Sequence, residues 1–139
     1  MGHPLKLMTR ASTWATRLSQ LARQTGTVRI MTYSLPDPEY VHTQIRRRPY
    51  EILLVAHAKF EDKARMITAA FPNIRVAVRN DTHAKVLLIE PCTVYISSAN
   101  FGDSGWVEST IGLHSTDAYT WYVENIFTPV WSSAVEIGG

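Results

Sequence analysis

The sequence predicts an α/β fold, a mixed β-sheet with helices packed on its faces, in a single domain over residues 1–139. Short apolar runs rich in β-branched residues alternate with longer segments whose apolar residues recur at helical spacing. Two of these apolar runs lie close enough together to form a hairpin, which adds antiparallel strands to a parallel strand–helix–strand pattern. A chain of 139 residues fits one domain and buries a substantial core.

The first elements alternate between helix and strand. Trp14 and Leu18 lie one helical turn apart, in a segment that ends at Gly26. Asp37-Pro38 supplies an N-cap and a proline at the first helical position. We therefore expect helices over residues 9–25 and 37–47, with a strand over residues 27–33 between them.

In the rest of the chain, apolar and β-branched runs predict the strands, and the last element is a helix. Pro129 is expected to interrupt this helix because proline has no N–H to donate. The predicted strands cover residues 52–56, 74–79, 82–89, 93–98 and 109–113, and the predicted helices cover residues 60–71 and 117–134.

Composition narrows the class of protein. The net charge of +2 falls short of the strongly basic balance of many nucleic-acid-binding domains. The single cysteine, Cys92, excludes an internal disulfide. No apolar run approaches the roughly 20 residues of a membrane helix, and the first residues lack the apolar stretch of a secretory signal. We expect a cytoplasmic protein with no stable membrane association, unless an export signal has been removed from it.

The most informative segment lies between residues 83 and 100. His83 and Lys85 share one face of a predicted strand, and Ser98 and Asn100 share one face at the end of the next. With a two-residue turn between the strands, antiparallel pairing sets Lys85 opposite Ser98 and His83 opposite Asn100. All four polar groups would then lie in one small patch.

Such a patch suits a phosphodiester. The lysine, serine and asparagine side chains bind non-bridging phosphate oxygens, and histidine acts as nucleophile, base or acid near neutral pH. No two of the five histidines have the spacing of an HExxH zinc site. We therefore expect neither a metal nor another cofactor. The histidines are His3, His42, His57, His83 and His114.

These residues resemble a known family. The spacing is similar to the HxK(x)4D(x)6GSxN motif of the phospholipase D superfamily, with glutamate at the family's aspartate and serine at its glycine. The resemblance covers residues 83–100 and implies a phospholipase D-like fold. The matching string is His83-x-Lys85-x4-Glu90-x6-Ser97-Ser98-x-Asn100.

The chain has one such motif, so it looks like the small single-motif bacterial endonucleases of that family, which build one site from two identical chains. The resemblance implies a homodimeric, metal-independent endonuclease or phosphodiesterase acting on DNA or RNA. His83 of one chain would attack phosphorus to form a phosphohistidine, and His83 of the other would protonate the leaving oxygen. Lys85 and Asn100 of both chains would hold the phosphate oxygens, with Ser98 as a further donor.

In the family a glutamate after the SxN segment orients the catalytic histidine, and Glu108 is the candidate for that role. The alternative is a solvated loop carboxylate, with Asp103 as the reserve candidate.

Further residues are candidates for substrate binding. Ser97 and Arg79 flank the motif strands. His57 either lines the groove or begins a helix, and Trp106 either stacks a base or packs in the core or dimer interface. The arginines at 46–48 either clamp the phosphate backbone or form a solvated helix end.

Two other functions stay open. One is a phosphodiesterase or phosphatidyl transferase on lipid or small nucleotides, using the same residues. The other is a catalytically weakened nucleic-acid-binding or inhibitor protein, because Glu90 and Ser97 depart from the family motif and the path to Glu108 is short.

Overall fold

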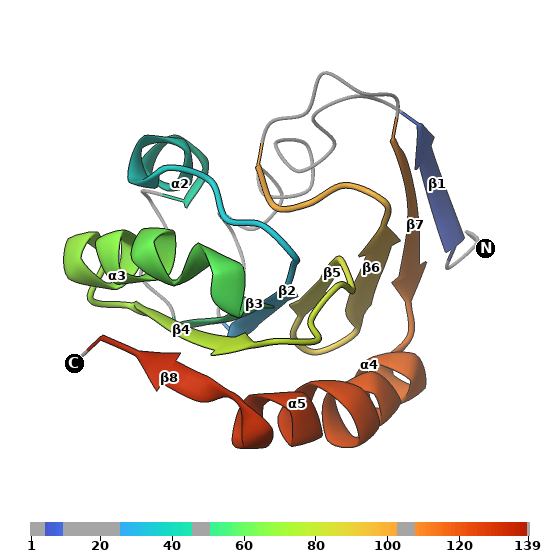
Figure 1. Ribbon diagram of the computed structural model, residues 1–139. Helices are drawn as coiled ribbons and strands as arrows, with labels where there is room; N and C mark the ends of the chain where they lie inside the picture. The colour runs from blue at the N-terminus through green and yellow to red at the C-terminus, as the bar shows by residue number, and fades with distance from the viewer. Residues whose placement is uncertain (1–4, 10–25, 46–50, 103–107, 139) are drawn as a thin grey trace.

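The computed structural model describes residues 5–9, 26–45, 51–102 and 108–138 (Figure 1). In this part of the chain eight strands form one sheet in the order β1-β7-β6-β5-β2-β3-β4-β8. The strands are β1 Leu5–Thr9, β2 Val28–Met31, β3 Ile52–His57, β4 Ile74–Arg79, β5 Val86–Ile89, β6 Thr93–Ser97, β7 Ser109–His114 and β8 Val135–Ile137. The helices are α2 Pro38–Ile45, the 3-10 turn η2 Ala58–Phe60, α3 Glu61–Ala70, α4 Thr116–Tyr122, the π-helix η3 Val123–Phe127 and α5 Thr128–Ser133.

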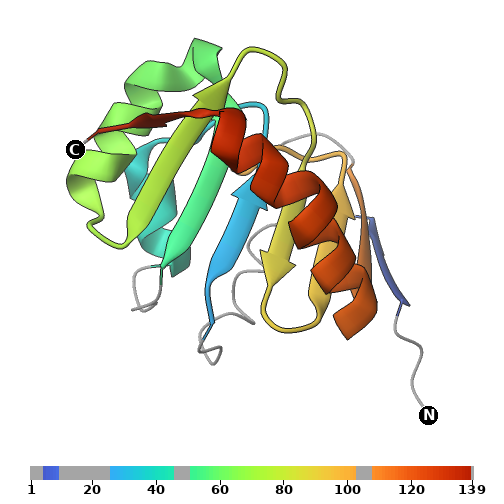
Figure 2. The same ribbon diagram turned by 90° about the horizontal axis from the view of Figure 1, so that it is seen from below.

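The sheet is mixed, as the sequence predicts. Strands β2, β3 and β4 are parallel to one another, and the other neighbouring pairs are antiparallel. Helices α2 and α3 cover one face, while α4, η3 and α5 cross the other face as one continuous rod (Figures 1 and 2). The predicted fold class is therefore confirmed.

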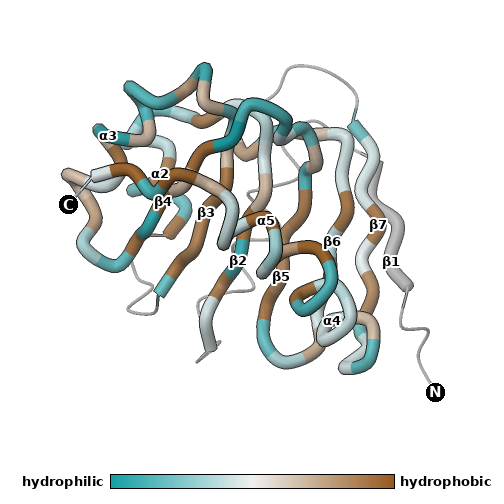
Figure 3. Tube along the Cα trace, turned by 60° about the horizontal axis from the view of Figure 1, so that its bottom comes forward, coloured by the Kyte–Doolittle hydropathy of each residue, from teal (hydrophilic) through white to brown (hydrophobic). Residues whose placement is uncertain are grey.

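The core has one apolar cluster on each face, because the central strands are buried on both sides. All four residues of β5 are buried, and successive residues face opposite layers. Leu87 and Ile89 pack in the cluster under α2 and α3, whereas Val86 and Leu88 pack in the cluster under α4 and α5. Hydrophobic residues are accordingly concentrated in the central strands (Figure 3).

The predicted hairpin is wrong in two respects. Strand β5 begins at Val86, so His83 and Lys85 precede the strand instead of belonging to it. Its register pairs Ile89 with Thr93, so the loop has three residues and the pairing lies one residue away from the predicted one. The Ser97 N–H consequently donates to the Lys85 carbonyl at 2.9 Å, where Ser98 was expected opposite Lys85.

Other boundaries also differ from the predicted ones. The helical hydrogen bonding changes at η3, ahead of Pro129 rather than at it, because the missing proline N–H leaves the preceding turn to rearrange. The short strand β8, which pairs with β4, was not predicted. Strand β1 was also not predicted, and most of the predicted helix over residues 9–25 lies outside the described residues.

The topology brings several element ends to one edge of the sheet. The carboxyl ends of β2, β3, β4 and β6 meet the amino ends of β5 and β7 there. In open α/β sheets this edge is where ligands usually bind.

Candidate active site

His83 and Lys85 lie side by side at this edge, just before β5. The Lys85 Nζ is 3.1 Å from His83 Nδ1 and 3.4 Å from its Nε2. The imidazole is exposed, whereas the lysine is half-buried. Burial lowers the pKa of the Lys85 ammonium below its ordinary value, and the negative charge of Glu108 partly offsets this effect. A nucleophilic imidazole beside a cation is a suitable arrangement for binding and attacking a phosphate.

Asn100 is held at the end of β2 by three donors. Its Oδ1 accepts from the backbone N–H of Tyr33 at 3.1 Å and of Ser34 at 3.3 Å, and lies 3.4 Å from the Thr32 hydroxyl. Backbone N–H groups only donate, so the atom facing them is the amide oxygen. The orientation of the amide is thereby fixed, and its Nδ2 group is the part left to donate to a ligand.

Ser98 and Glu108 meet across the β6–β7 connection. The Ser98 hydroxyl donates to Glu108 Oε1 at 3.2 Å and accepts from the Ser109 N–H at 3.0 Å. The carboxylate expected to orient His83 is therefore hydrogen-bonded to Ser98 here. The negative charge of Glu108 nevertheless raises the pKa of the Lys85 ammonium, against the effect of burial.

His57 reaches the same edge, with both of its ring nitrogens engaged. Nδ1 accepts from the Lys59 N–H at 3.0 Å, which caps η2, and Nε2 lies 2.8 Å from the carbonyl oxygen of Asn80. Because a carbonyl only accepts, Nε2 carries the proton. The structure therefore gives His57 the helix-capping role that was one of its two predicted roles.

Arg79 is committed to a neighbouring carboxylate. Its Nε and Nη2 donate to the two carboxylate oxygens of Asp81, each at 2.7 Å, and its Nη1 donates to the Ser133 hydroxyl. This hydrogen bonding lowers the pKa of Asp81, so the pair stays ionised. A guanidinium paired in this way has little capacity left for phosphate.

The two residues that depart from the family motif lie in different surroundings. The Ser97 hydroxyl accepts from the Ala99 N–H at 2.9 Å and lies 2.8 Å from the Thr110 hydroxyl, so it is used within the β6–β7 pair. Glu90 lies in the β5–β6 loop at the opposite edge of the sheet, where Arg29 donates to it at 3.1 Å and to Tyr119 at 2.8 Å. Arg29 of β2 therefore links the β5–β6 loop to α4.

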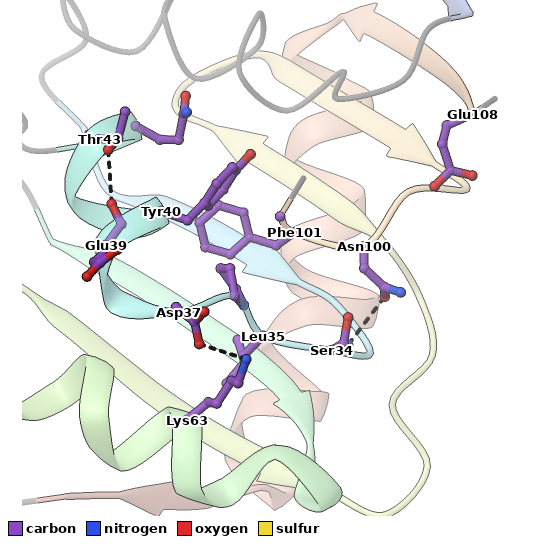
Figure 4. Close-up of a pocket in the computed structure, with 13 residues that line it drawn as sticks. Ser34, Leu35, Asp37, Glu39, Tyr40, Thr43, Lys63, Asn100, Phe101 and Glu108 are labelled. Carbon is purple, nitrogen blue, oxygen red and sulfur yellow. Dashed lines mark hydrogen bonds and ion pairs between the residues drawn. The ribbon is translucent and has the colours of Figure 1, made fainter. Parts of the chain in front are cut away.

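A pocket of about 800 Å³ adjoins Asn100 between the β2–α2 connection, α2 and the loop after β6 (Figure 4). Its lining includes Glu39, Glu108 and Asp37, the last of which is paired with Lys63 at 2.9 Å. Carboxylates outnumber cations among these groups, so the pocket does not favour a phosphate. The polar edge formed by His83 and Lys85 is better suited to the anion.

The segment Thr32–Ser34 also contributes to this site, which was not predicted from the sequence. The strand was predicted to continue to residue 33, which would place Thr32 and Tyr33 inside a regular ladder. In the structure β2 ends at Met31, and the buried Thr32 hydroxyl accepts from the Phe101 N–H at 2.9 Å. Their position after a buried parallel strand, at the carboxyl edge, was the available signal.

Some expectations fall on residues that the structure does not describe, namely Trp106, Asp103 and the arginines at 46–48. Among the described residues, no three His, Cys, Asp or Glu side chains gather as a metal site would require. No described helix has both the length and the apolar character needed to cross a bilayer.

No family model matches the sequence, and no curated protein matches it significantly. Solved structures do match. Nuc from Salmonella typhimurium, described as a phospholipase D family member, superposes with a TM-score of 0.76 at 15% identity, covering 97% of this chain and 99% of that one. The chain has the phospholipase D-like fold.

Two further structures extend the comparison. NucT from Helicobacter pylori matches with a TM-score of 0.70 at 15% identity, over 94% of this chain and 98% of that one. TrmBL2, described as an archaeal chromatin protein with a novel mode of DNA binding, matches with a TM-score of 0.71 at 7% identity, over 99% of this chain and 54% of that one. The fold of this chain is therefore similar both to that of Nuc, a phospholipase D family member, and to part of TrmBL2, a chromatin protein.

Proposed function

We propose that this phospholipase D-like protein is a phosphodiesterase that cleaves nucleic acid without a metal ion, through a phosphohistidine on His83. The observation that carries the proposal is the convergence of four side chains at one edge of the sheet. His83 and Lys85 precede β5, while Ser98 and Asn100 follow β6. The imidazole of His83 provides a nucleophile, and the Lys85 ammonium and the Asn100 amide provide donors for a phosphate, while the Ser98 hydroxyl donates to Glu108 beside them.

In the proposed reaction an imidazole nitrogen of His83 attacks phosphorus and forms a P–N bond. The bond from phosphorus to the leaving oxygen breaks, and that oxygen takes a proton from a general acid. Water then hydrolyses the phosphohistidine and restores the imidazole. Lys85 and the Nδ2 group of Asn100 stabilise the negative charge that accumulates on the non-bridging oxygens.

We further propose that this general acid is His83 of the partner subunit in a homodimer. The geometry of the other described histidines supports this step. Both nitrogens of His57 are engaged, His42 lies against Phe71, and His114 lies 3.0 Å from the Thr93 hydroxyl. None of these three is free at the edge that carries His83.

The test uses plasmid DNA, single-stranded DNA and RNA with EDTA present throughout. We expect the wild type to cleave at least one of them and His83→Ala to lose activity by on the order of 10³-fold. His114→Ala is the matched control, because it removes an exposed histidine from the opposite edge. Full activity in His83→Ala would contradict the proposal, and light scattering that finds a monomer in the active fraction would contradict the shared site.

A second candidate is a nucleic-acid-binding protein without turnover. The partner of Glu108 favours it, because the hydrogen bond that the structure shows for this carboxylate is with Ser98 instead of His83. The fold similarity to TrmBL2 also supports it. Salt-sensitive binding of nucleic acid by a wild type that cleaves none of the three substrates would favour this function over hydrolysis.

A further inference from the structure

Tyr33 joins the separate parts of the candidate site, and its backbone is held by two of them. Its N–H donates to Asn100 Oδ1 at 3.1 Å, and its carbonyl accepts from the His57 N–H at 3.1 Å. The first bond links it to the loop after β6, and the second links it to the end of β3. Because its N–H and its carbonyl are both hydrogen-bonded, the Tyr33 backbone has little freedom to shift. The position of its Cα atom, from which the side chain extends, is therefore fixed.

The ring of Tyr33 lies among three other rings. Its centroid is 5.0 Å from that of His57, 5.3 Å from that of Phe60 and 5.4 Å from that of His83. These separations lie within the range of favourable aromatic pairs. His57 is bonded at both nitrogens, and Phe60 packs against the core under α2 and α3. Two of the three ring contacts are therefore with fixed groups, and the third is with His83.

His83 has few other constraints on its orientation. It precedes β5, its side chain is exposed, and its other contact within the described chain is with the Lys85 ammonium. A lysine carries its charge on a flexible stem, so it attracts the imidazole without fixing the plane of the ring. An attacking group must be oriented closely, since a displacement of about 1 Å costs on the order of 10²-fold in rate.

We propose that Tyr33 is a positioning residue whose ring sets the plane of the His83 imidazole while its N–H fixes the Asn100 amide. This assignment rests on the proposed function, because it concerns the same reaction. The aromatic ring makes the contacts with His83, His57 and Phe60. Tyr33→Phe therefore retains the role, and Tyr33→Leu removes it while leaving the backbone bond to Asn100 in place.

The test compares Tyr33→Leu and Tyr33→Phe with the matched control Tyr122→Leu. Tyr122 is also half-buried, but it packs in the cluster under α4 and α5 on the other face. One readout is kcat and KM for a labelled oligonucleotide in EDTA. The other is the NMR signals of the His83 ring in substrate-free protein, assigned through their loss in His83→Ala.

We expect Tyr33→Leu to lower kcat by on the order of 10²-fold with little change in KM. The His83 ring signals should shift in the same variant. Tyr33→Phe and Tyr122→Leu should keep both readouts near those of the wild type. Unchanged His83 signals in a folded Tyr33→Leu would overturn the inference, and so would an equal fall in kcat for Tyr122→Leu. A rise in KM alone would also overturn it, because it would make Tyr33 a substrate contact.

The two readouts separate this inference from the proposed function. If the wild type cleaves no substrate, the proposed function fails, while the NMR comparison still decides whether Tyr33 positions His83. If Tyr33→Leu does not fold, Phe60→Leu replaces it, because Phe60 braces the Tyr33 ring. We then expect a smaller shift of the His83 signals and a smaller fall in kcat, and the absence of any shift would overturn the inference.

Discussion

Replacing Asn100 with aspartate or with alanine distinguishes the role of its amide oxygen from that of its amide nitrogen. Oδ1 accepts from the N–H groups of Tyr33 and Ser34, so Nδ2 faces away from them. Aspartate keeps an oxygen for these donors but places a second oxygen where the donor was. Alanine removes both ends. The first substitution therefore tests the ligand-facing end, and the second tests the buried end as well.

The structure gives the expected magnitudes. In Asn100→Ala the two N–H groups lose their acceptor, at about 1 kcal/mol each for half-buried donors, whereas the Thr32 hydroxyl keeps the Ser34 carbonyl at 3.0 Å. We expect a loss of about 2 kcal/mol in the free energy of unfolding, or about 8 °C in Tm. In Asn100→Asp we expect wild-type stability and a kcat lower by on the order of 10²- to 10³-fold, as for removal of one oxyanion donor.

The assay pairs denaturant unfolding with the rate of oligonucleotide cleavage in EDTA. Asn125→Asp is the matched control, because it adds the same charge on the rod that crosses the other face of the sheet. Wild-type activity in Asn100→Asp would refute the assignment of Nδ2 to the phosphate. A loss of stability in Asn100→Asp equal to that in Asn100→Ala would refute the orientation of the amide.

Two further predictions concern charge. Lys85 binds a phosphate oxygen only as an ammonium, so the rate falls as pH rises through its pKa, which burial lowers and Glu108 raises. Glu108→Gln removes the raising effect, so we expect the alkaline limb of the pH–rate profile to move to lower pH, and an unmoved limb would contradict this. At the opposite edge, Glu90→Gln weakens the 3.1 Å ion pair with Arg29. The Arg29 side chain is 19% exposed and the Glu90 side chain is 38% exposed. We expect unfolding free energy to fall by about 1 kcal/mol with the cleavage rate unchanged, and lost activity at full stability would show that Glu90 acts on the site.

The parts of the fold that follow from local pattern could be predicted from the sequence. Strand β4 has the predicted bounds, because its alternating apolar residues and flanking turns are local signals. Strand β8 has three residues and depends on distant partners: it pairs with β4, and Arg75 donates to Glu136 at 2.7 and 3.0 Å. No periodicity within three residues predicts such a strand.

Some residues of the candidate site could likewise be predicted from local spacing, and others could not. The motif spacing picks out His83, Lys85 and Asn100, and their catalytic roles stay predictions. Tyr33 and Thr32 were missed because their importance lies in contacts with residues that are distant in the chain, such as His83 for Tyr33 and Phe101 for Thr32. A run that alternates as a strand does not reveal that pairing stops at Met31.

The observed register of the hairpin shows that the placement of the candidate residues does not depend on strict strand alternation. A one-residue slip sends every side chain of a regular strand to the other face, so the observed pairing of Ile89 with Thr93 would separate Lys85 from Ser98 in a continuous ladder. The ladder stops at Val86, before alternation reaches the candidate residues. The Ser98 N–H instead donates to the Ser109 carbonyl at 2.9 Å, on the β7 side.

Asn100 is fixed in the same manner, by donors at the end of β2 rather than by a strand partner. The segment after β6 is thus placed by bonds beyond the strand ends: Ser98 is bonded to Ser109 of β7, and Asn100 is bonded to the residues that follow β2. The convergence of the candidate groups depends on the order β7-β6-β5-β2-β3 in the sheet, which brings these ends together, and only weakly on the register of one hairpin. This is the physical reason why the residues that the motif spacing picks out lie at one edge of the sheet, although the predicted pairing between them is wrong.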